Sequence, residues 1–229
     1  MTAAVVIGAS GGIGAALAEA LEEEDAFTYV HRFGRSLAGG NRLDLEDETS
    51  IAAAAARVAG DAPSLVLVAT GLLHDGERGP EKAVRDLDPA WLARQFAINA
   101  IGPALVAKHF LPIMAAKGSR SVLAMLSARV GIIGDNRLGG WYGYRASKAA
   151  LNQLVRTLAI EDRRRNERGL VVGLHPGTVD TALSRPFRTG GRDLFKPGRA
   201  AVQLLDVIDG LRPVDSGKLF DWEGKEVTP

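Results

Sequence analysis

The chain has 229 residues and a formal net charge of +1, and 46% of its residues are hydrophobic while 24% are charged. These values are ordinary for a soluble globular protein, and the small net charge gives no reason to expect binding to nucleic acid or to an anionic membrane. The absence of cysteine excludes disulfides, thiolate metal sites and cysteine nucleophiles, and the four histidines lack metal-ligand spacing. No apolar run approaches the roughly 20 residues of a membrane span, so we expect a cytoplasmic protein.

The hydrophobic pattern predicts strands that alternate with helices along the chain. The first strand, at 3–7, is a continuous apolar run of the kind that a parallel sheet buries on both faces. We expect Pro103 to mark a kink or boundary in the long helix and Gly169 to cap the helix that precedes it. Further strands are predicted at 27–31, 64–69, 121–126, 170–174 and 218–222, and helices at 15–24, 50–58, 89–116, 144–165 and 199–211.

This alternation indicates the α/β class, because successive βαβ units build a parallel sheet with helices on both faces. No linker, repeat or low-complexity segment divides the chain. We therefore predict one doubly wound parallel sheet, Rossmann-like with three αβα layers, in a single domain over residues 1–229.

A glycine-rich turn lies between the first strand and the first helix, at Gly8-Ala9-Ser10-Gly11-Gly12-Ile13-Gly14. A diphosphate needs backbone N–H groups at close range, and glycine removes the side chains that would block it, while the helix N-terminus supplies a favourable potential. The alternative is a tight turn without a ligand. The strand, the spacing and the helix favour a dinucleotide-binding turn.

Tyr144 and Lys148 are four residues apart on a predicted helix, which places both on one face. A tyrosine with its ordinary pKa of about 10 is a poor acid or base at neutral pH, and a nearby ammonium favours the phenolate. We therefore expect Lys148, with help from the positive charge of an oxidised nicotinamide, to lower the pKa of Tyr144. Taken alone, this spacing occurs by chance in many helices. Tyr142 is a weaker candidate, because Lys148 is six residues away and on a different face.

The spacing of the glycine turn and the Tyr144-Arg145-Ala146-Ser147-Lys148 segment together resemble the short-chain dehydrogenase/reductase family. The resemblance implies a catalytic set made of Asn99, Ser127, Tyr144 and Lys148. It also implies a set of cofactor-binding residues: Gly8, Ser10, Gly12, Ile13, Gly14, Asp44, Leu45, Gly71, Tyr144, Lys148, Pro176, Gly177, Val179 and Thr181. In this family the asparagine organises a water linked to the lysine, and the serine hydrogen-bonds the substrate oxygen.

Several of these residues also have a purely structural interpretation. Asp44 is compatible with a turn residue, Asn99 with a helix bend, Ser127 with the end of a strand and Thr181 with a helix cap. The chain also departs from the family after the third strand. There Val68-Ala69-Thr70-Gly71 keeps the glycine but lacks the usual asparagines. These departures, the short length and the closing segments around Ser216 and Trp222 resemble the C-factor-like branch.

The choice between NAD(H) and NADP(H) depends on the end of the second strand, where an acidic residue would repel a 2′-phosphate. The segment from Thr28 to Ser36 contains no acid. Arg35 occupies the place of the family's phosphate-binding arginine, Ser36 offers a hydrogen bond, and Arg32 is a further candidate. The sequence therefore favours NADP(H), the alternative being that these arginines are solvated.

The resemblance implies interconversion of a carbonyl and an alcohol on a small, apolar substrate. The alternatives are a cofactor-binding signalling or regulatory protein with little turnover, and another reaction such as epimerisation. The irregular segment 182–197 is interpreted as a substrate lid or as an ordinary loop, and Trp141 as a packing residue or part of the substrate site. The family usually assembles through its two long helices, which implies a homodimer or homotetramer through 89–116 and 144–165.

Overall fold

The computed structural model of the protein describes residues 3–115, 117–187 and 194–228. Over these ranges a parallel sheet of six strands runs in the order β2-β1-β3-β4-β5-β6. The strands are β1 Ala3–Ile7, β2 Tyr29–Phe33, β3 Leu65–Val68, β4 Ser121–Leu126, β5 Gly169–His175 and β6 Leu219–Asp221. The predicted α/β fold, with a doubly wound parallel sheet, is confirmed.

The chain reverses its direction of winding between β1 and β3. It first moves outward from β1 to β2, and then returns to place β3 on the other side of β1. Ala4 of β1 pairs with Leu65 of β3, and Ile7 pairs with Val68, so both strands end at the same edge. In open α/β sheets such a reversal leaves a crevice at the carboxyl ends of the strands, where ligands bind.

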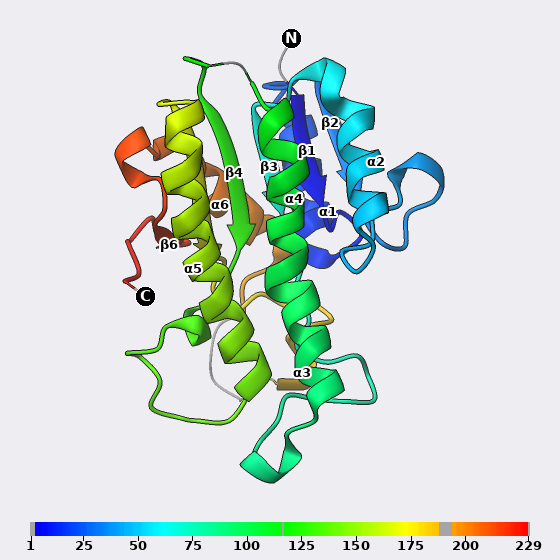
Figure 1. The fold of residues 1–229 in the computed structure, drawn as a ribbon, viewed down its shortest axis with the longest axis vertical. Helices are drawn as coiled ribbons and strands as arrows, with labels where there is room; N and C mark the ends of the chain where they lie inside the picture. Colours follow the sequence, from blue (N-terminus) through cyan, green and yellow to red (C-terminus); the bar gives the residue numbers. More distant parts are fainter. Residues whose placement is uncertain (1–2, 116, 188–193, 229) are drawn as a thin grey trace.

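Helices cover both faces of the sheet, as Figure 1 shows. On one face α1 Gly12–Glu23 and α6 Pro197–Gly210 pack over a core that includes Leu17, Leu21 and Leu204. On the other face α2 Glu48–Val58, α4 Gly102–Phe110 and α5 Tyr142–Arg165 cover a second core. The lower end of α5 and the helix α3, Pro89–Phe96, extend beyond the carboxyl edge of the sheet in Figure 1.

The long helix predicted at 89–116 is divided into segments. α3 passes into a π-helical turn at Ala97–Ile101, followed by α4 and a 3₁₀ turn at Leu111–Ile113. Pro103 lies in the first turn of α4, so the expected boundary is confirmed. The π-helical turn inserts an extra residue per turn, which is a frequent feature of functional sites.

The same helical stretch corrects the expectation about apolar runs. Pro89–Ile113 is long and apolar enough, by length and composition, to cross a membrane, with a mean hydropathy of 1.3. Within the fold, however, Val106, Ala107 and Phe110 are buried in the core of the sheet. Its apolar character is explained by packing against the sheet and the neighbouring helices.

Two local predictions were wrong. β2 spans Tyr29–Phe33 and not 27–31, because Phe33 pairs with Ile7 and enters the core. Tyr29, at the start of the strand, is 45% exposed. Gly169 does not cap α5, because it is the first residue of β5. Asn166 is the C-cap, and its side chain accepts hydrogen bonds from the backbone N–H groups of Gly118 and Arg168.

Candidate active site

The structure brings the four predicted catalytic side chains to the carboxyl edge of the sheet. Ser127 directly follows β4, Tyr144 and Lys148 lie on α5, and Asn99 lies in the π-helical turn. Exposed fractions are 4% for Ser127, 8% for Tyr144, 3% for Lys148 and 0% for Asn99. Polar side chains are rarely this buried without a partner or a function. The four residues, which are far apart in the sequence, therefore lie together in the fold.

Tyr144 and Lys148 share a face of α5 but are not hydrogen-bonded to each other. Lys148 Nζ lies 6.0 Å from the centroid of the Tyr144 ring and donates a hydrogen bond of 2.8 Å to the carbonyl oxygen of Leu126. Burial raises the pKa of Tyr144 to about 12 and lowers the pKa of Lys148 to about 8. The expectation that the lysine lowers the tyrosine pKa is not met in this structure, because desolvation is the dominant effect on both groups.

Asn99 connects the long helix to the loop after β3 and to α5. Its Oδ1 accepts from the Leu72 N–H at 2.7 Å, while Nδ2 donates to Leu72 O at 2.8 Å and to Ser147 Oγ at 3.0 Å. A β-carbon added to Gly71 would lie 3.8 Å from both Asn99 Oδ1 and Lys148 Nζ. Asn99 thus holds the Gly71–Leu72 loop beside Lys148, and the π-helical turn directs its side chain there.

Ser127 has a partner that the sequence analysis did not identify. Ser127 Oγ donates a hydrogen bond of 2.6 Å to Oδ1 of Asn152, one turn beyond Lys148 on α5. Asn152 is only 7% exposed, and its Nδ2 is buried without a hydrogen-bond partner. The signal in the sequence was the i,i+4 spacing of Lys148 and Asn152, which places a second polar residue on the catalytic face of the helix.

An aromatic cluster stands beside Tyr144. The Trp141 ring lies 6.2 Å from the Tyr144 ring and 5.3 Å from the Phe187 ring, both in edge-to-face geometry. Phe187 also contacts His74 at 5.6 Å, and His74 Nε2 is 3.1 Å from the carbonyl oxygen of Ala182. Three loops that are distant in the sequence therefore form an apolar wall next to the tyrosine. Of the segment predicted as a lid, residues 188–193 lie outside the described residues.

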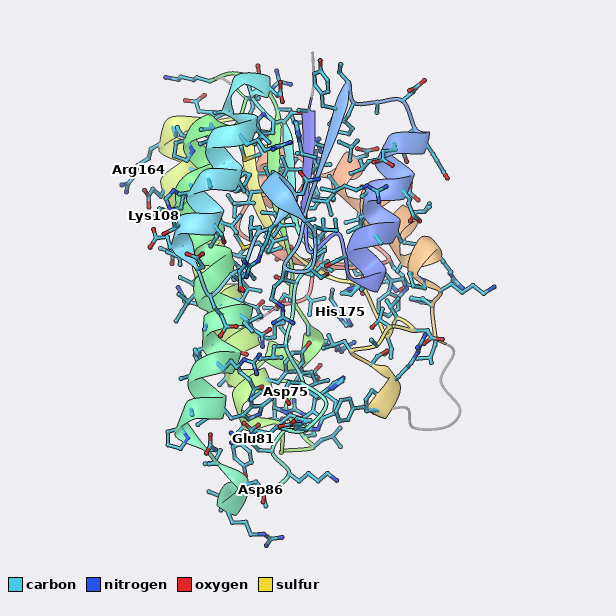
Figure 2. All side chains as sticks on the ribbon, turned by 90° about the vertical axis from the view of Figure 1, so that its right-hand side faces the viewer. Asp75, Glu81, Asp86, Lys108, Arg164 and His175 are labelled. Atoms are coloured by element: carbon cyan, nitrogen blue, oxygen red, sulfur yellow. The ribbon has the colours of Figure 1, made fainter. Side chains whose placement is uncertain are left out.

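A buried carboxylate supports the start of α5. Glu81 is 3% exposed and accepts hydrogen bonds from Gln95 Nε2 at 2.9 Å and from the Gly143 N–H at 3.1 Å. Its backbone oxygen accepts from Trp141 N, and Trp141 has a left-handed backbone with φ 53°. Figure 2 shows Glu81 and Asp75 in the loop beyond the end of the sheet. Nothing in the sequence pattern separated Glu81 from the exposed acids of this loop.

The glycine turn is closely packed on its inner side and exposed on its outer side. Gly8 has φ +91°, and a β-carbon there would lie 2.6 Å from the Ala69 carbonyl oxygen, while one on Gly14 would collide with Gly8 O. Ser10 and Gly12 are exposed, and α1 begins without a side-chain cap. The first N–H groups of a helix have no intrahelical partner, so this turn at Gly12 and Ile13 suits a diphosphate.

The segment predicted to select the cofactor lies against this turn. A β-carbon on Gly34 would lie 2.8 Å from Ser10 Oγ, so Arg35 and Ser36 follow directly beside the glycine turn, and both are exposed. Arg32 instead forms a two-pronged ion pair with Glu22 of α1, with Nε–Oε1 at 2.8 Å. Arg32 thus already has a partner on α1, whereas Arg35 is exposed beside the turn.

Asp44 and Leu45 follow the loop that leaves β2. The Asp44 carboxylate accepts from the Glu46 N–H at 3.1 Å, as expected of a turn residue, and its backbone N–H donates to Ser50 Oγ. Leu45 is 8% exposed and packs on Gly102, where a β-carbon would come within 2.6 Å of it. Both residues therefore have a local structural role in the fold. Their role in binding the cofactor stays a prediction.

The segment after β5 reaches the glycine turn at Thr181. Gly177 has φ +74°, and a β-carbon there would lie 2.9 Å from Phe195 and 3.0 Å from Trp222. Val179 is buried and pairs with Phe195, and the Thr181 methyl group would lie 2.9 Å from a β-carbon on Gly12. Thr181 thus lies against the glycine turn, whereas the cofactor-binding roles of Pro176, Gly177 and Val179 stay predictions. The adjoining His175 is partly buried, and desolvation lowers its pKa to about 4.

No group of three or more metal-ligating side chains occurs within residues 3–115, 117–187 and 194–228.

Comparisons with known proteins place the chain in a family. A family model described as enoyl-(acyl carrier protein) reductase matches residues 8–203. The chain is 42% identical over 146 residues to C-signal of Myxococcus xanthus, which spans 63% of this chain and 82% of that protein. It is 30% identical over 233 residues to 1-hydroxy-2-glutathionyl-2-methyl-3-butene dehydrogenase of Rhodococcus sp. (strain AD45), covering 98% of both.

The solved structure of the NADPH-bound carbonyl reductase from chicken fatty liver has the same fold. The TM-score is 0.84 at 24% identity, and the match covers 100% of this chain and 94% of that chain. The family model and the full-length dehydrogenase relative carry the assignment, and the likeness to C-signal confirms the expected branch. The chain is an oxidoreductase of the short-chain dehydrogenase/reductase family and belongs with its C-factor-like members.

Proposed function

We propose that the protein is an NADP(H)-dependent oxidoreductase that interconverts a carbonyl and an alcohol on a small, apolar substrate. The observation that carries the proposal is the convergence of Tyr144, Ser127, Lys148 and Asn99 at the edge of the sheet where the glycine turn lies. When bound there, the nicotinamide cofactor supplies or accepts a hydride.

The turn at Ser10, Gly12 and Ile13, of which Ser10 and Gly12 are exposed, is the proposed diphosphate site. Gly71, Val179 and Thr181 are proposed to border the path from there toward Tyr144. Lys148 holds the nicotinamide ribose from α5. Arg35 and Ser36 hold a 2′-phosphate beside the turn, since a guanidinium matches phosphate in charge and geometry. The NADPH named for the chicken carbonyl reductase supports this choice.

Tyr144 is the proposed proton donor to the carbonyl oxygen, and Ser127 orients that oxygen. Because burial raises the pKa of Tyr144 to about 12, the phenol keeps its proton at neutral pH. A protonated tyrosine is the form that carbonyl reduction requires, and the phenolate is the form that alcohol oxidation requires, so the same group serves both directions. Asn99 holds the Gly71–Leu72 loop beside Lys148 and is proposed to maintain the proton path.

The wall formed by Trp141, Phe187 and His74 supports an apolar substrate, because aromatic side chains line the side of the site next to Tyr144. Segment 182–197, of which 182–187 and 194–197 are described, is proposed as a substrate lid. The partly exposed Ile101 and Ile160 lie on the two long helices and support a homodimer or homotetramer through them.

The decisive experiment is a screen of NADPH oxidation with ketones, aldehydes and quinones. Enoyl thioesters are included because the matched family is described as an enoyl reductase. Reduction of a carbonyl by the wild type is the expected result. Turnover of enoyl thioesters and of no carbonyl substrate would show that the reaction is reduction of a carbon–carbon double bond, and would contradict the proposal.

A second candidate function is cofactor binding in a signalling role with little turnover. The 42% identity to the protein named C-signal favours it. Tight NADPH binding without reduction of any carbonyl in the same screen would support this alternative.

A further inference from the structure

The hydrogen bond that Ser127 makes in the structure conflicts with its proposed role as a donor to the substrate oxygen. A hydroxyl has one proton, and here Ser127 Oγ gives that proton to Asn152 Oδ1 at 2.6 Å. A carbonyl oxygen is an acceptor only. With its proton committed to Asn152, Ser127 would present lone pairs to the substrate oxygen, and the two acceptors would repel each other.

The unpartnered atom of Asn152 resolves this difficulty. Its Nδ2 is buried and donates to no described residue, while Oδ1 takes the serine proton. Rotation of the carboxamide by half a turn exchanges the two atoms, so that Nδ2 donates to Ser127 Oγ and the hydroxyl proton is released. Both orientations leave one amide atom without a partner, so a substrate oxygen that needs a donor decides between them.

We propose that Asn152 is a positioning residue that determines whether Ser127 donates or accepts. In the working state the Asn152 amide donates to Ser127 Oγ, and Ser127 donates its only proton to the substrate oxygen. Asn152 is held for this by α5, one turn from Lys148, so the helix that carries the proton donor also orients the serine. The inference rests on the proposed function, because it assigns Ser127 to the substrate oxygen.

The proposal predicts that Asn152→Asp is less active than Asn152→Ala, whereas a purely space-filling role of Asn152 predicts the opposite order. Asn152→Asp preserves the size of the side chain but leaves only acceptors, so Ser127 stays committed to it, and kcat falls on the order of 100-fold, as for loss of a transition-state donor. Asn152→Ala frees the hydroxyl to rotate, and kcat falls only about 10-fold. If Asn152 only filled space, the alanine variant, which leaves a cavity, would be the more impaired.

The test measures kcat with NADPH and 9,10-phenanthrenequinone for the wild type and for both variants, alone and combined with Ser127→Ala. We expect Ser127→Ala to abolish the difference between Asp and Ala at position 152, with the Kd for NADPH unchanged throughout. Equal effects of the 152 substitutions with and without Ser127 would overturn the inference. A fully active Ser127→Ala would instead contradict the proposed role of the serine.

A second readout does not depend on turnover. The side-chain amide resonances of Asn152, identified by their loss in Asn152→Ala, should shift when a ketone is added to the NADP⁺ complex, because Nδ2 then donates to Ser127. They should not shift in Ser127→Ala. Resonances that ignore the ketone in the wild type would show that the carboxamide does not rotate, and would overturn the proposal.

Discussion

Lys148 Nζ points to the carbonyl oxygen of Leu126, at 2.8 Å, and lies 6.0 Å from the centroid of the Tyr144 ring. The two residues are thus neighbours on α5 without a direct bond between ammonium and phenol. Burial has the dominant effect on both groups, because it raises the pKa of Tyr144 to about 12 and lowers the pKa of Lys148 to about 8. The spacing in the sequence suggests a direct interaction between the two side chains, whereas in the fold burial has the larger effect on both.

The dependence of reduction on pH follows from the raised pKa of Tyr144. Reduction needs the protonated phenol, which persists up to about pH 12, so kcat/KM for a carbonyl substrate with bound NADPH should not fall through loss of the Tyr144 proton at neutral pH. Alcohol oxidation needs the phenolate and should rise continuously from pH 7 to 10. Rates in both directions across this range test the prediction. A fall in reduction with an apparent pKa near 7 would mean that Lys148 lowers the tyrosine pKa after all.

Burial of Lys148 should cost stability. Its pKa is lowered from 10.5 to about 8, so the unfolded chain binds the proton more tightly, and the penalty is present below pH 8 and disappears above 10.5. Lys148→Met should therefore stabilise the fold at pH 7 by about 2–3 kcal/mol, at 1.36 kcal/mol per pKa unit less the lost hydrogen bond to Leu126. Thermal unfolding should show a Tm higher by roughly 5 °C at pH 7 and little gain at pH 10.5. A lower Tm at pH 7 would contradict this.

Arg35 should determine the preference for NADPH. Removal of a guanidinium that contacts phosphate costs about 1.5–3 kcal/mol, so Arg35→Ala should weaken NADPH binding roughly 10- to 100-fold. NADH affinity should change little. Arg163→Ala, at the exposed end of α5, serves as the matched control. Fluorescence titration of both cofactors gives the answer, and tighter NADH than NADPH binding by the wild type would refute the assignment.

Glu81 should be important for stability. Glu81→Ala leaves Gln95 Nε2 and the Gly143 N–H without acceptors in a buried site, at a cost of about 2–4 kcal/mol. We expect a Tm several degrees lower and a frayed start of α5 in hydrogen exchange. The exposed Glu77→Ala in the same loop is the control and should have little effect. Equal stability of the two variants would show that Glu81 does not hold α5.

Local patterns were sufficient to predict the sheet and its helices, and the resemblance to the short-chain family supplied the four catalytic candidates. The apolar run Ala3–Ile7, the glycine turn and the Tyr144–Lys148 spacing each depend on residues close in the sequence. The assignment of specific residues to the active site stays a prediction until the variants are measured.

Contacts between distant segments were not predicted. The bond between Ser127 and Asn152 spans 25 residues, and the one between Glu81 and Gly143 spans 62. His74, Trp141 and Phe187 likewise meet only after three loops have folded onto one edge. Desolvation of Tyr144 also depends on this packing, so its effect on the pKa of the phenol was not predicted from the sequence.

The role of Tyr144 as the proton donor is the centre of this account. The measurement that tests it most directly compares wild type and Tyr144→Phe in NADPH oxidation with one carbonyl substrate, with the Kd for NADPH determined in parallel. Phenylalanine keeps the ring against Trp141 and removes only the hydroxyl. We predict an unchanged Kd and a fall in kcat of at least about 100-fold. Full activity in Tyr144→Phe would contradict the assignment.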